Sequence, residues 1–272
     1  MGYPTMMVHV DFDAATESRV RLATGLADRF EATLIGVAAC APHPPLARGG
    51  VGIAPLFTEE TADDLKVALD QLERRFRSIA VNGSRQVEWR SALDCPTEFA
   101  TREACATDLV IIGRERLSAD PFRSLDPGAL LLQVGWPVLL VPTGIGRLDA
   151  KRVVVACKDT REARRALSDS LPFLHDAEKI FLVEICAEPE AEAVQHLNNI
   201  TTYLARHRIT TATGLTLQAA NVTDELLGIV HKKKADLLVA GAYGHSRLGE
   251  WVFGGVTHDL LQKSPICCLL SH

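Results

Sequence analysis

Four glycines near the carboxyl end of the chain have the spacing of a loop that could hold a phosphate group. They are Gly241, Gly244, Gly254 and Gly255, and the segment "GGVTHDLLQK" that begins at Gly254 is predicted to be a helix. Glycines permit a positive φ and let a backbone approach a ligand closely. Unpaired amides at a helix start attract anions, and Thr257 adds a hydroxyl to the first turn. The spacing predicts an anion-binding loop, although it matches neither GxxxxGK[ST] nor GxGxxG.

The same glycines also have a purely structural explanation. Gly254 and Gly255 could serve only the close packing of the helix, and Gly241 could be a turn at a strand end. Trp251 and Phe253 are large apolar anchors, which favour a fixed loop over flexible filler. From the residues alone, phosphate binding and close packing are equally supported.

Short apolar runs alternate with longer amphipathic segments along the chain, which is typical of βαβ units in a mostly parallel sheet. In the first half, strands are expected at 6–12, 32–39, 86–93, 107–113 and 136–142. In the second half, they are expected at 152–158, 179–186, 213–219, 235–241 and 264–270. Ligands collect beyond the carboxyl ends of such strands, so the glycine loop begins at the correct edge of the sheet.

The two halves of the chain repeat each other. "TDLVIIG" and "ADLLVAG" place Asp108 against Asp236 and Gly113 against Gly241 at one constant offset. The first strands of the halves lie further apart, because the first half carries a Pro- and Gly-rich insertion at 41–57. This insertion is expected to be a mobile surface loop. A constant offset between similar sequence segments indicates a tandem duplication.

Two domains follow from this duplication. We predict domains at 1–145 and 146–272, with a linker at 143–150. The two copies are expected to pack against each other as an intramolecular pseudo-dimer. One large doubly wound sheet of ten strands is the alternative that the repeat disfavours.

Composition and charge argue against several classes of protein. The chain is 47% hydrophobic and 23% charged, and its net charge of −5 argues against a nucleic-acid partner, because phosphate binding needs a basic face. It has no apolar run long enough to span a membrane and begins without a basic signal region, so a cytoplasmic location is expected. The seven cysteines form no CxxC pair, which indicates reduced, buried thiols and no metal site.

The spacing Gly241-x2-Gly244-x9-Gly254, followed by the small residue Gly255, resembles the nucleotide loop of the universal stress protein family. The segment "VVVACKDTREARRALSDSLPFL" at the start of the second half and "SPICCLL" after the loop are similar to family elements too. The resemblance covers the whole chain as two tandem domains. It implies an α/β fold with two Rossmann-like (adenine nucleotide alpha hydrolase-like) domains, each a five-stranded parallel sheet with helices on both faces.

The resemblance also implies a ligand and the residues that hold it. In family members that bind ATP, the loop holds the phosphates, and the ends of the first two strands hold adenine and ribose. ATP, with or without Mg²⁺, is therefore the implied cofactor. Mapped onto this sequence, the phosphate contacts are Gly241, Gly244, Gly254, Gly255 and Thr257, and the base contacts are Ala156, Cys157, Lys158 and Ile185.

Two positions depart from the family pattern. Gly255 replaces the usual Ser or Thr, which removes one hydroxyl and about 1 kcal/mol of hydrogen bonding. Lys158 replaces the usual Asp at the end of the first strand, with Asp159 one place later. Lys158 either reaches the phosphates as a point charge or fills the pocket and turns outward, and the sequence leaves both open.

The first half is expected to hold only a vestigial site. Arg116 stands in place of the second glycine, and Asp126 and Pro127 replace the last glycine pair. Asp126 is predicted to be a helix N-cap, with Pro127 at the first helical position. Its carboxylate would occupy the amides that a phosphate needs and would repel the ligand. Asp11 keeps the first-strand acid of the family, which leaves a remnant base pocket open.

Three functions are compatible with these features. The first is a stress-response protein that binds an adenine nucleotide as a regulator, with ATP ordering the 245–253 loop of the second half. The second is a scaffold without nucleotide, which binds an unidentified protein partner through its pseudo-dimer surface or the 41–57 loop; a homodimer is also open. The third is a slow ATPase using His245 and Glu250. It is the least favoured, because the sequence shows no convincing catalytic set, so no enzyme is expected.

Overall fold

The computed structural model describes residues 2–43, 62–80, 86–114, 120–186, 191–219, 221–244 and 255–272. Several predictions fall outside these residues. They concern Gly254, the 245–253 loop, Arg116 and most of the 41–57 insertion.

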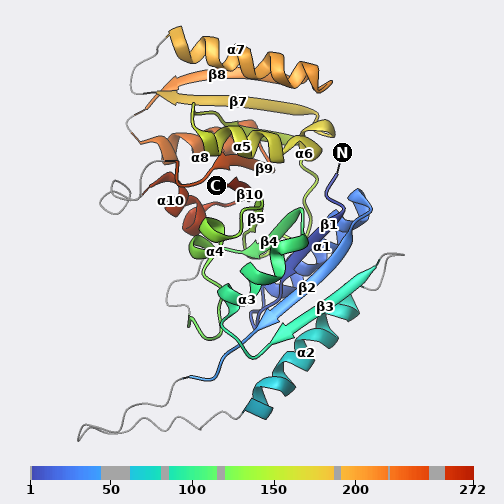
Figure 1. Ribbon diagram of the computed structural model, residues 1–272. Coiled ribbons are helices and arrows are strands. Elements are labelled where there is room, and N and C mark those ends of the chain that lie inside the picture. Colours follow the sequence, from blue (N-terminus) through green and yellow to red (C-terminus); the bar gives the residue numbers. More distant parts are fainter. Residues whose placement is uncertain are drawn as a thin grey trace, which may run out of the picture.

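All ten predicted strands are present, and they join into a single sheet (Figure 1). The strands of the first half are β1 (Thr5–His9), β2 (Thr33–Ala39), β3 (Val87–Ala92), β4 (Leu109–Gly113) and β5 (Val138–Val141). Those of the second half are β6 (Arg152–Ala156), β7 (Lys179–Cys186), β8 (Ala212–Gln218), β9 (Leu237–Gly241) and β10 (Cys267–Ser271). The strand order is β3-β2-β1-β4-β5-β10-β9-β6-β7-β8.

Two parallel half-sheets meet edge to edge in the middle of this sheet. Neighbouring strands are parallel within each half. At the junction β5 and β10 run antiparallel, with Leu139 opposite Leu269. The preference against a single ten-stranded sheet was therefore wrong, because the pseudo-dimer and the continuous sheet are one and the same arrangement.

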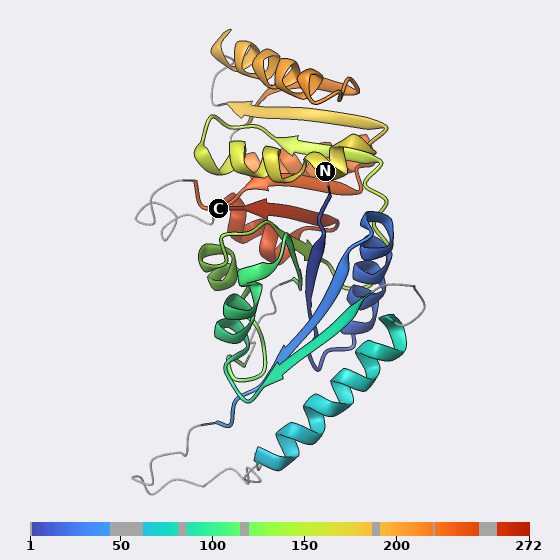
Figure 2. The ribbon, with the colours of Figure 1, turned by 45° about the vertical axis from the view of Figure 1, so that its right-hand side comes forward.

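Helices cover both faces of the sheet, as the fold prediction required (Figure 2). One face is covered by α1 (Thr16–Phe30), α2 (Ala62–Ala80), α5 (Arg161–Asp169), α6 (Leu171–His175) and α7 (Ala191–Arg206). The other is covered by α3 (Pro96–Glu103), the 3-10 helix η1 (Ala104–Ala106), α4 (Pro127–Gln133), α8 (Val222–Lys233) and α10 (Val256–Lys263). Each face has one hydrophobic core, and each core extends across both halves.

The cysteines follow this division of the sheet into two faces. Cys267 packs in one core and Cys268 in the other, which confirms that the two thiols point to opposite sides of the strand. All seven cysteines are free, and Cys105 is exposed, so the expectation of buried thiols was wrong there. Burial raises the pKa of Cys268 to about 12, which keeps this thiol protonated and unreactive at neutral pH.

An aromatic cluster joins the two halves of the chain. The rings of Tyr3 and Phe30, from the first half, lie 5.4 Å from the ring of Phe173 in α6. The Tyr3 hydroxyl donates to the Asp169 carbonyl oxygen at 2.5 Å, and Arg29 pairs with Asp176 at 2.9 Å. These contacts tie α1 and the segment before β1 to the region of α5 and α6.

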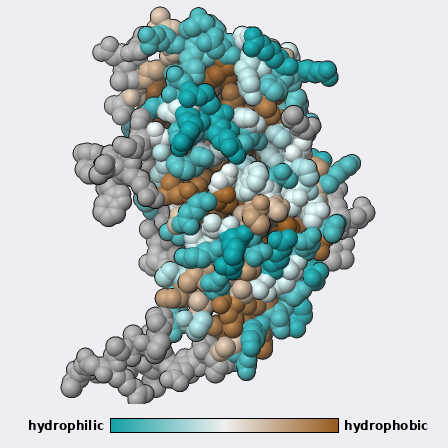
Figure 3. Space-filling model, in the orientation of Figure 1, coloured by the Kyte–Doolittle hydropathy of each residue, from teal (hydrophilic) through white to brown (hydrophobic). Residues whose placement is uncertain are grey.

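The face shown in Figure 3 offers little continuous apolar area. There, hydrophobic residues appear as small patches among hydrophilic ones. Large hydrophobic residues that are exposed, such as Val67 and Val194, lie on different helices. Within the described parts of the chain, none of the helices is both long and apolar enough to cross a bilayer.

Candidate functional site

A cavity of about 830 Å³ lies beyond the carboxyl ends of β6, β7 and β9, and we name it the C-terminal cavity. It brings together every predicted site residue that the structure describes. These residues are Ala156, Cys157, Lys158, Ile185, Gly241, Gly244, Gly255 and Thr257. They come from the ends of three strands and from the start of α10. The order of the strands in the sheet brings these ends together at one edge.

Sequence reasoning missed the wall that α8 contributes to this cavity. Asn221, Val222, Thr223 and Leu226 line it, as does Asp259 of α10. The missed signal was topological. A helix that follows a parallel strand begins at the same edge where ligands collect, and Asn221 is an N-cap residue type at the start of α8.

One part of the cavity is apolar. Its apolar lining comes from neighbouring strands and from the first turn and a half of α8, namely Val183, Ile185, Val222, Leu226 and Ala240. A planar, weakly polar group such as a nucleobase fits a slot of this kind, because the slot removes its faces from water.

Three helices begin at the C-terminal cavity, and two of them are capped by side chains. Thr160 accepts a hydrogen bond from the Ala163 amide at 3.3 Å at the start of α5. Asn221 accepts from the amides of Thr223 and Asp224 at 3.1 and 3.2 Å at the start of α8. These side chains occupy amides that an anion would otherwise use.

The third helix, α10, begins without a side-chain cap. Its N-cap residue is Gly255, with φ −67° and ψ 153°, and no described side chain accepts a hydrogen bond from the first turn. The helix dipole adds a partial positive charge at this end. The start of α10 is therefore the part of the cavity best suited to an anion.

The glycines at the end of β9 have a packing role as well as a place in the cavity wall. Neither Gly241 nor Gly244 has a positive φ, which is found instead at Tyr243, with φ 55°. A Cβ on Gly241 would lie 2.6 Å from the Glu162 carbonyl carbon, so β9 packs directly on the backbone at the start of α5. Neither glycine therefore uses the positive φ that its residue type permits, and both lie close to the start of α5.

Thr257 stabilises the turn after β9. It is 4% exposed, and its hydroxyl oxygen accepts a hydrogen bond from the Tyr243 amide at 3.1 Å. This bond holds the left-handed residue Tyr243 in place. The Thr257 hydroxyl is thus partly committed within the protein before any ligand is bound.

Two ionisable side chains in the cavity have shifted pKa values. Burial, assisted by the negative charge of Glu184, raises the pKa of the Cys157 thiol to about 12. A hydrogen bond from Lys263 lowers the pKa of Asp259, and the two side chains pair at 2.6 Å. Lys158 is exposed and lines the cavity.

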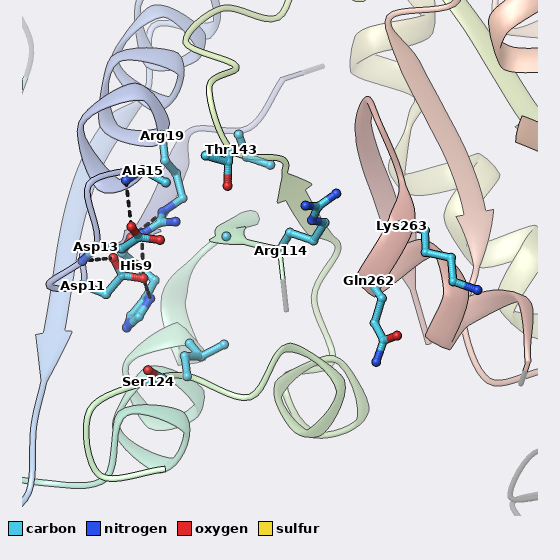
Figure 4. Close-up of a pocket in the computed structure, with 13 residues that line it drawn as sticks. His9, Asp11, Asp13, Ala15, Arg19, Arg114, Ser124, Thr143, Gln262 and Lys263 are labelled. Carbon is cyan, nitrogen blue, oxygen red and sulfur yellow. Dashed lines mark hydrogen bonds and ion pairs between the residues drawn. The ribbon is translucent and has the colours of Figure 1, made fainter. Parts of the chain in front are cut away.

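The corresponding region of the first half contains a second cavity of about 570 Å³, which we name the N-terminal cavity (Figure 4). The predicted cap is confirmed beside it. Asp126 accepts a hydrogen bond from the Ala129 amide at 3.0 Å, and Pro127 is the first residue of α4. One first-turn amide of α4 is therefore already engaged by a carboxylate, whereas no described side chain caps α10.

Asp11, the retained acid, faces inward in the N-terminal cavity and is held by its own domain. Its carboxylate pairs with Arg19 at 3.0 Å and accepts hydrogen bonds from the Thr16 hydroxyl and, at 3.0 Å, from the Asp13 amide. His9 lies beside it. Burial lowers the pKa of His9 to about 4, Asp11 opposes this shift and Arg19 adds to it, so the imidazole is neutral at pH 7.

Among the described residues, no three His, Cys, Asp or Glu side chains lie close enough together to hold a metal ion. The start of α10 and the exposed Lys158 are the positively charged features that line the C-terminal cavity.

Comparison with known proteins relates this arrangement to a family. Residues 150–272 match the profile of the Universal stress protein family. No curated protein matches the sequence at a significant level. Among solved structures, a universal stress protein from Archaeoglobus fulgidus DSM 4304 superposes with a TM-score of 0.72 at 12% identity, covering 98% of this chain and 95% of that one.

A second full-length match is a functionally unknown protein from Pseudomonas aeruginosa PAO1. Its TM-score is 0.60 at 14% identity, and the alignment covers 99% of this chain and 92% of that one. At such low identities, these matches establish a shared two-domain fold. The C-terminal domain therefore belongs to the universal stress protein family, and the N-terminal domain repeats its fold in a tandem arrangement.

Proposed function

We propose that this tandem universal stress protein binds ATP in its C-terminal cavity and acts as a nucleotide-dependent regulator in the stress response. One observation carries the proposal. The start of α10 at Gly255 opens on a cavity without a side-chain cap, whereas the equivalent start of α4 is closed by Asp126. The two domains share a fold but differ at the position where phosphates would lie.

The dimensions and chemistry of the C-terminal cavity fit an adenine nucleotide. Its volume of about 830 Å³ lies in the range of roughly 300–1,000 Å³ that is usual for small-molecule sites. Val183, Ile185 and Leu226 would cover the faces of the base. The phosphates would meet the amides of α10, where each charge contact is worth about 0.3–2 kcal/mol. Lys158 would add a cation at the mouth.

We expect binding without rapid turnover. Cys157 is protonated at neutral pH because its pKa is about 12, so it is a poor nucleophile. Asp259 is ion-paired with Lys263, which weakens it as a general base. His245 and Glu250, the residues considered for a slow ATPase, lie outside the described residues.

The experiment is a calorimetric titration of ATP into the wild-type protein and into the variant Gly255→Asp. The variant places at α10 the carboxylate cap that α4 has in Asp126. We expect wild-type protein to bind ATP and the variant to bind at least about tenfold more weakly, because a charged cap competes for the same amides. Parallel titrations with EDTA show whether Mg²⁺ contributes.

Gly228→Asp is the matched control for this substitution. Gly228 is exposed on α8, and a side chain there would meet nothing within 4 Å, so the variant adds the same charge away from the cavity. It should bind ATP as the wild-type protein does. Absence of binding by wild-type protein at millimolar ATP, or equal loss in both variants, would refute the proposal.

A scaffold function without nucleotide is the second candidate. It is favoured by the engagement of the Thr257 hydroxyl with Tyr243 and by the packing of Gly241 on α5, since both residues then have structural roles. In this case ATP would leave the melting temperature unchanged. Light scattering of the purified protein would show whether it forms homodimers, and cross-linking in cells would identify a protein partner.

A further inference from the structure

The N-terminal cavity lies between the two domains and is lined by both. Asp11, Asp13 and Arg19 lie together on its first-domain side, whereas Gln262 and Lys263 of α10 lie on the opposite side (Figure 4). The side chain of Arg114 projects between these two walls. The cavity is therefore built from both halves of the chain.

The carboxylates of this cavity are engaged by the protein itself. The Asp11 carboxylate receives Arg19, the Thr16 hydroxyl and the Asp13 amide. The Asp13 carboxylate accepts from the Ala15 amide at 3.1 Å. These carboxylates organise the turn that leads into α1, which limits their capacity to hold a ligand.

Several other polar side chains that line the cavity have few or no partners among the described residues. Within the described residues, Arg114 has no carboxylate at ion-pair distance, and its guanidinium makes one long contact of 3.4 Å with the Ser264 carbonyl oxygen. The side chains of Ser124, Thr143 and Gln262 make no hydrogen bond to another described residue, although they line the same space. The cavity thus presents a cation that can only donate, together with two hydroxyls and an amide that can also donate.

The guanidinium of Arg19 is a second, buried donor group in this cavity. Its side chain is only 3% exposed. Its Nε donates to the His9 carbonyl oxygen and its Nη2 to the Thr16 hydroxyl, both at 2.9 Å. Nη1, which lies against Gly113, has no acceptor among the described residues. Buried donors without partners are costly, and a bound acceptor removes that cost.

We propose that the N-terminal cavity binds a small tetrahedral oxyanion, either inorganic phosphate or the phosphate group of a small ester. Arginine binds such groups through two parallel hydrogen bonds, and the surrounding hydroxyl and amide groups supply donors from other directions. The apolar lining is limited to Leu125, Val141 and Ala15, so the cavity lacks the broad slot that would cover a nucleobase. The ligand therefore differs in class from the nucleotide proposed for the C-terminal cavity.

The test is calorimetric titration of the full chain with inorganic phosphate and, separately, with glycerol 3-phosphate. All titrations are made in the Gly255→Asp background, so that phosphate binding at α10 does not contribute. Stronger binding of the ester than of phosphate would identify a metabolite as the natural ligand. The reverse order would identify inorganic phosphate.

Two variants address the cavity, and one serves as a control. Arg114→Gln should weaken phosphate binding roughly 10- to 100-fold, the range for loss of a charged hydrogen bond. Thr143→Val, at an exposed position with little effect on folding, should weaken it several-fold. Arg206→Gln removes an equal charge from an exposed site on α7 and should leave binding unchanged. Equal affinities in all three variants, or no binding in the Gly255→Asp background, would overturn the proposal.

Discussion

Gly241 shows that a glycine of a ligand-binding motif can also be required by packing. It occupies the first position of the glycine pattern, yet its missing side chain leaves room for the backbone of α5. A methyl group there would lie 2.9 Å from the Ala163 Cα atom. Because the obstacle is backbone, the neighbouring chain cannot rotate out of the way as a side chain would.

We therefore expect Gly241→Ala to lower the free energy of unfolding by about 1–3 kcal/mol, the usual cost of overpacking. Gly228→Ala is the comparison, because Gly228 sits within α8 with open space around it. This change should raise stability by about 0.5–1 kcal/mol through helix propensity. Urea denaturation of both variants measures the difference. A neutral Gly241→Ala would show that the strand end can move away from α5.

From the sequence, it was easier to predict which residues lie at the site than which contacts each of them makes. Asp126 followed by Pro127 has one common use, a helix start, and the structure confirms it. Thr257 and Tyr243 were harder, because their hydrogen bond joins residues on either side of a loop. Composition and spacing do not encode which backbone amide a hydroxyl will reach.

At the scale of elements, the starts of helices distinguish the two domains. The helices α4 and α10 occupy equivalent places after the fourth strand of each half, but Asp126 caps the first and Gly255 leaves the second open. The strand and helix positions were predictable because their apolar patterns are local. The α8 wall of the cavity was not, because it depends on how strands order themselves in the sheet.

Removal of the α4 cap is a test of this element. Asp126→Ala should lower the free energy of unfolding by about 0.5–2 kcal/mol, the usual cost of losing an N-cap. It should not create an ATP site in the first half, because the N-terminal cavity lacks the apolar wall found in the second. Urea denaturation and ATP titration of the variant check the two parts. A new ATP site would mean that the cap alone separates the domains.

At the scale of the whole molecule, the antiparallel pairing of β5 with β10 makes one sheet from two domains. The repeat in the sequence predicted two copies but not the edges through which they meet. The apolar runs of β5 and β10 would look the same whether they faced each other or a different chain. The continuous sheet therefore became visible only in three dimensions.

One consequence is that the two halves should unfold together. Phe173 is fully buried and contacts Tyr3 and Phe30 from the other half. Phe173→Ala should lower the free energy of unfolding by about 3–5 kcal/mol. Scanning calorimetry should show a single transition shifted to lower temperature. Two separated transitions, with one unchanged from the wild-type protein, would indicate that the halves are independent.

Helix α10 has one end at each cavity: Gly255 and Asp259 line one, Gln262 and Lys263 the other. The ion pair between Asp259 and Lys263 connects the two ends within a single turn. A rigid rod of eight residues cannot be displaced at one end without disturbing the other. If binding in one cavity moves this helix, it will change the affinity of the other cavity for its ligand. The second ligand must then change the affinity for the first by the same factor, whether the effect is positive or negative.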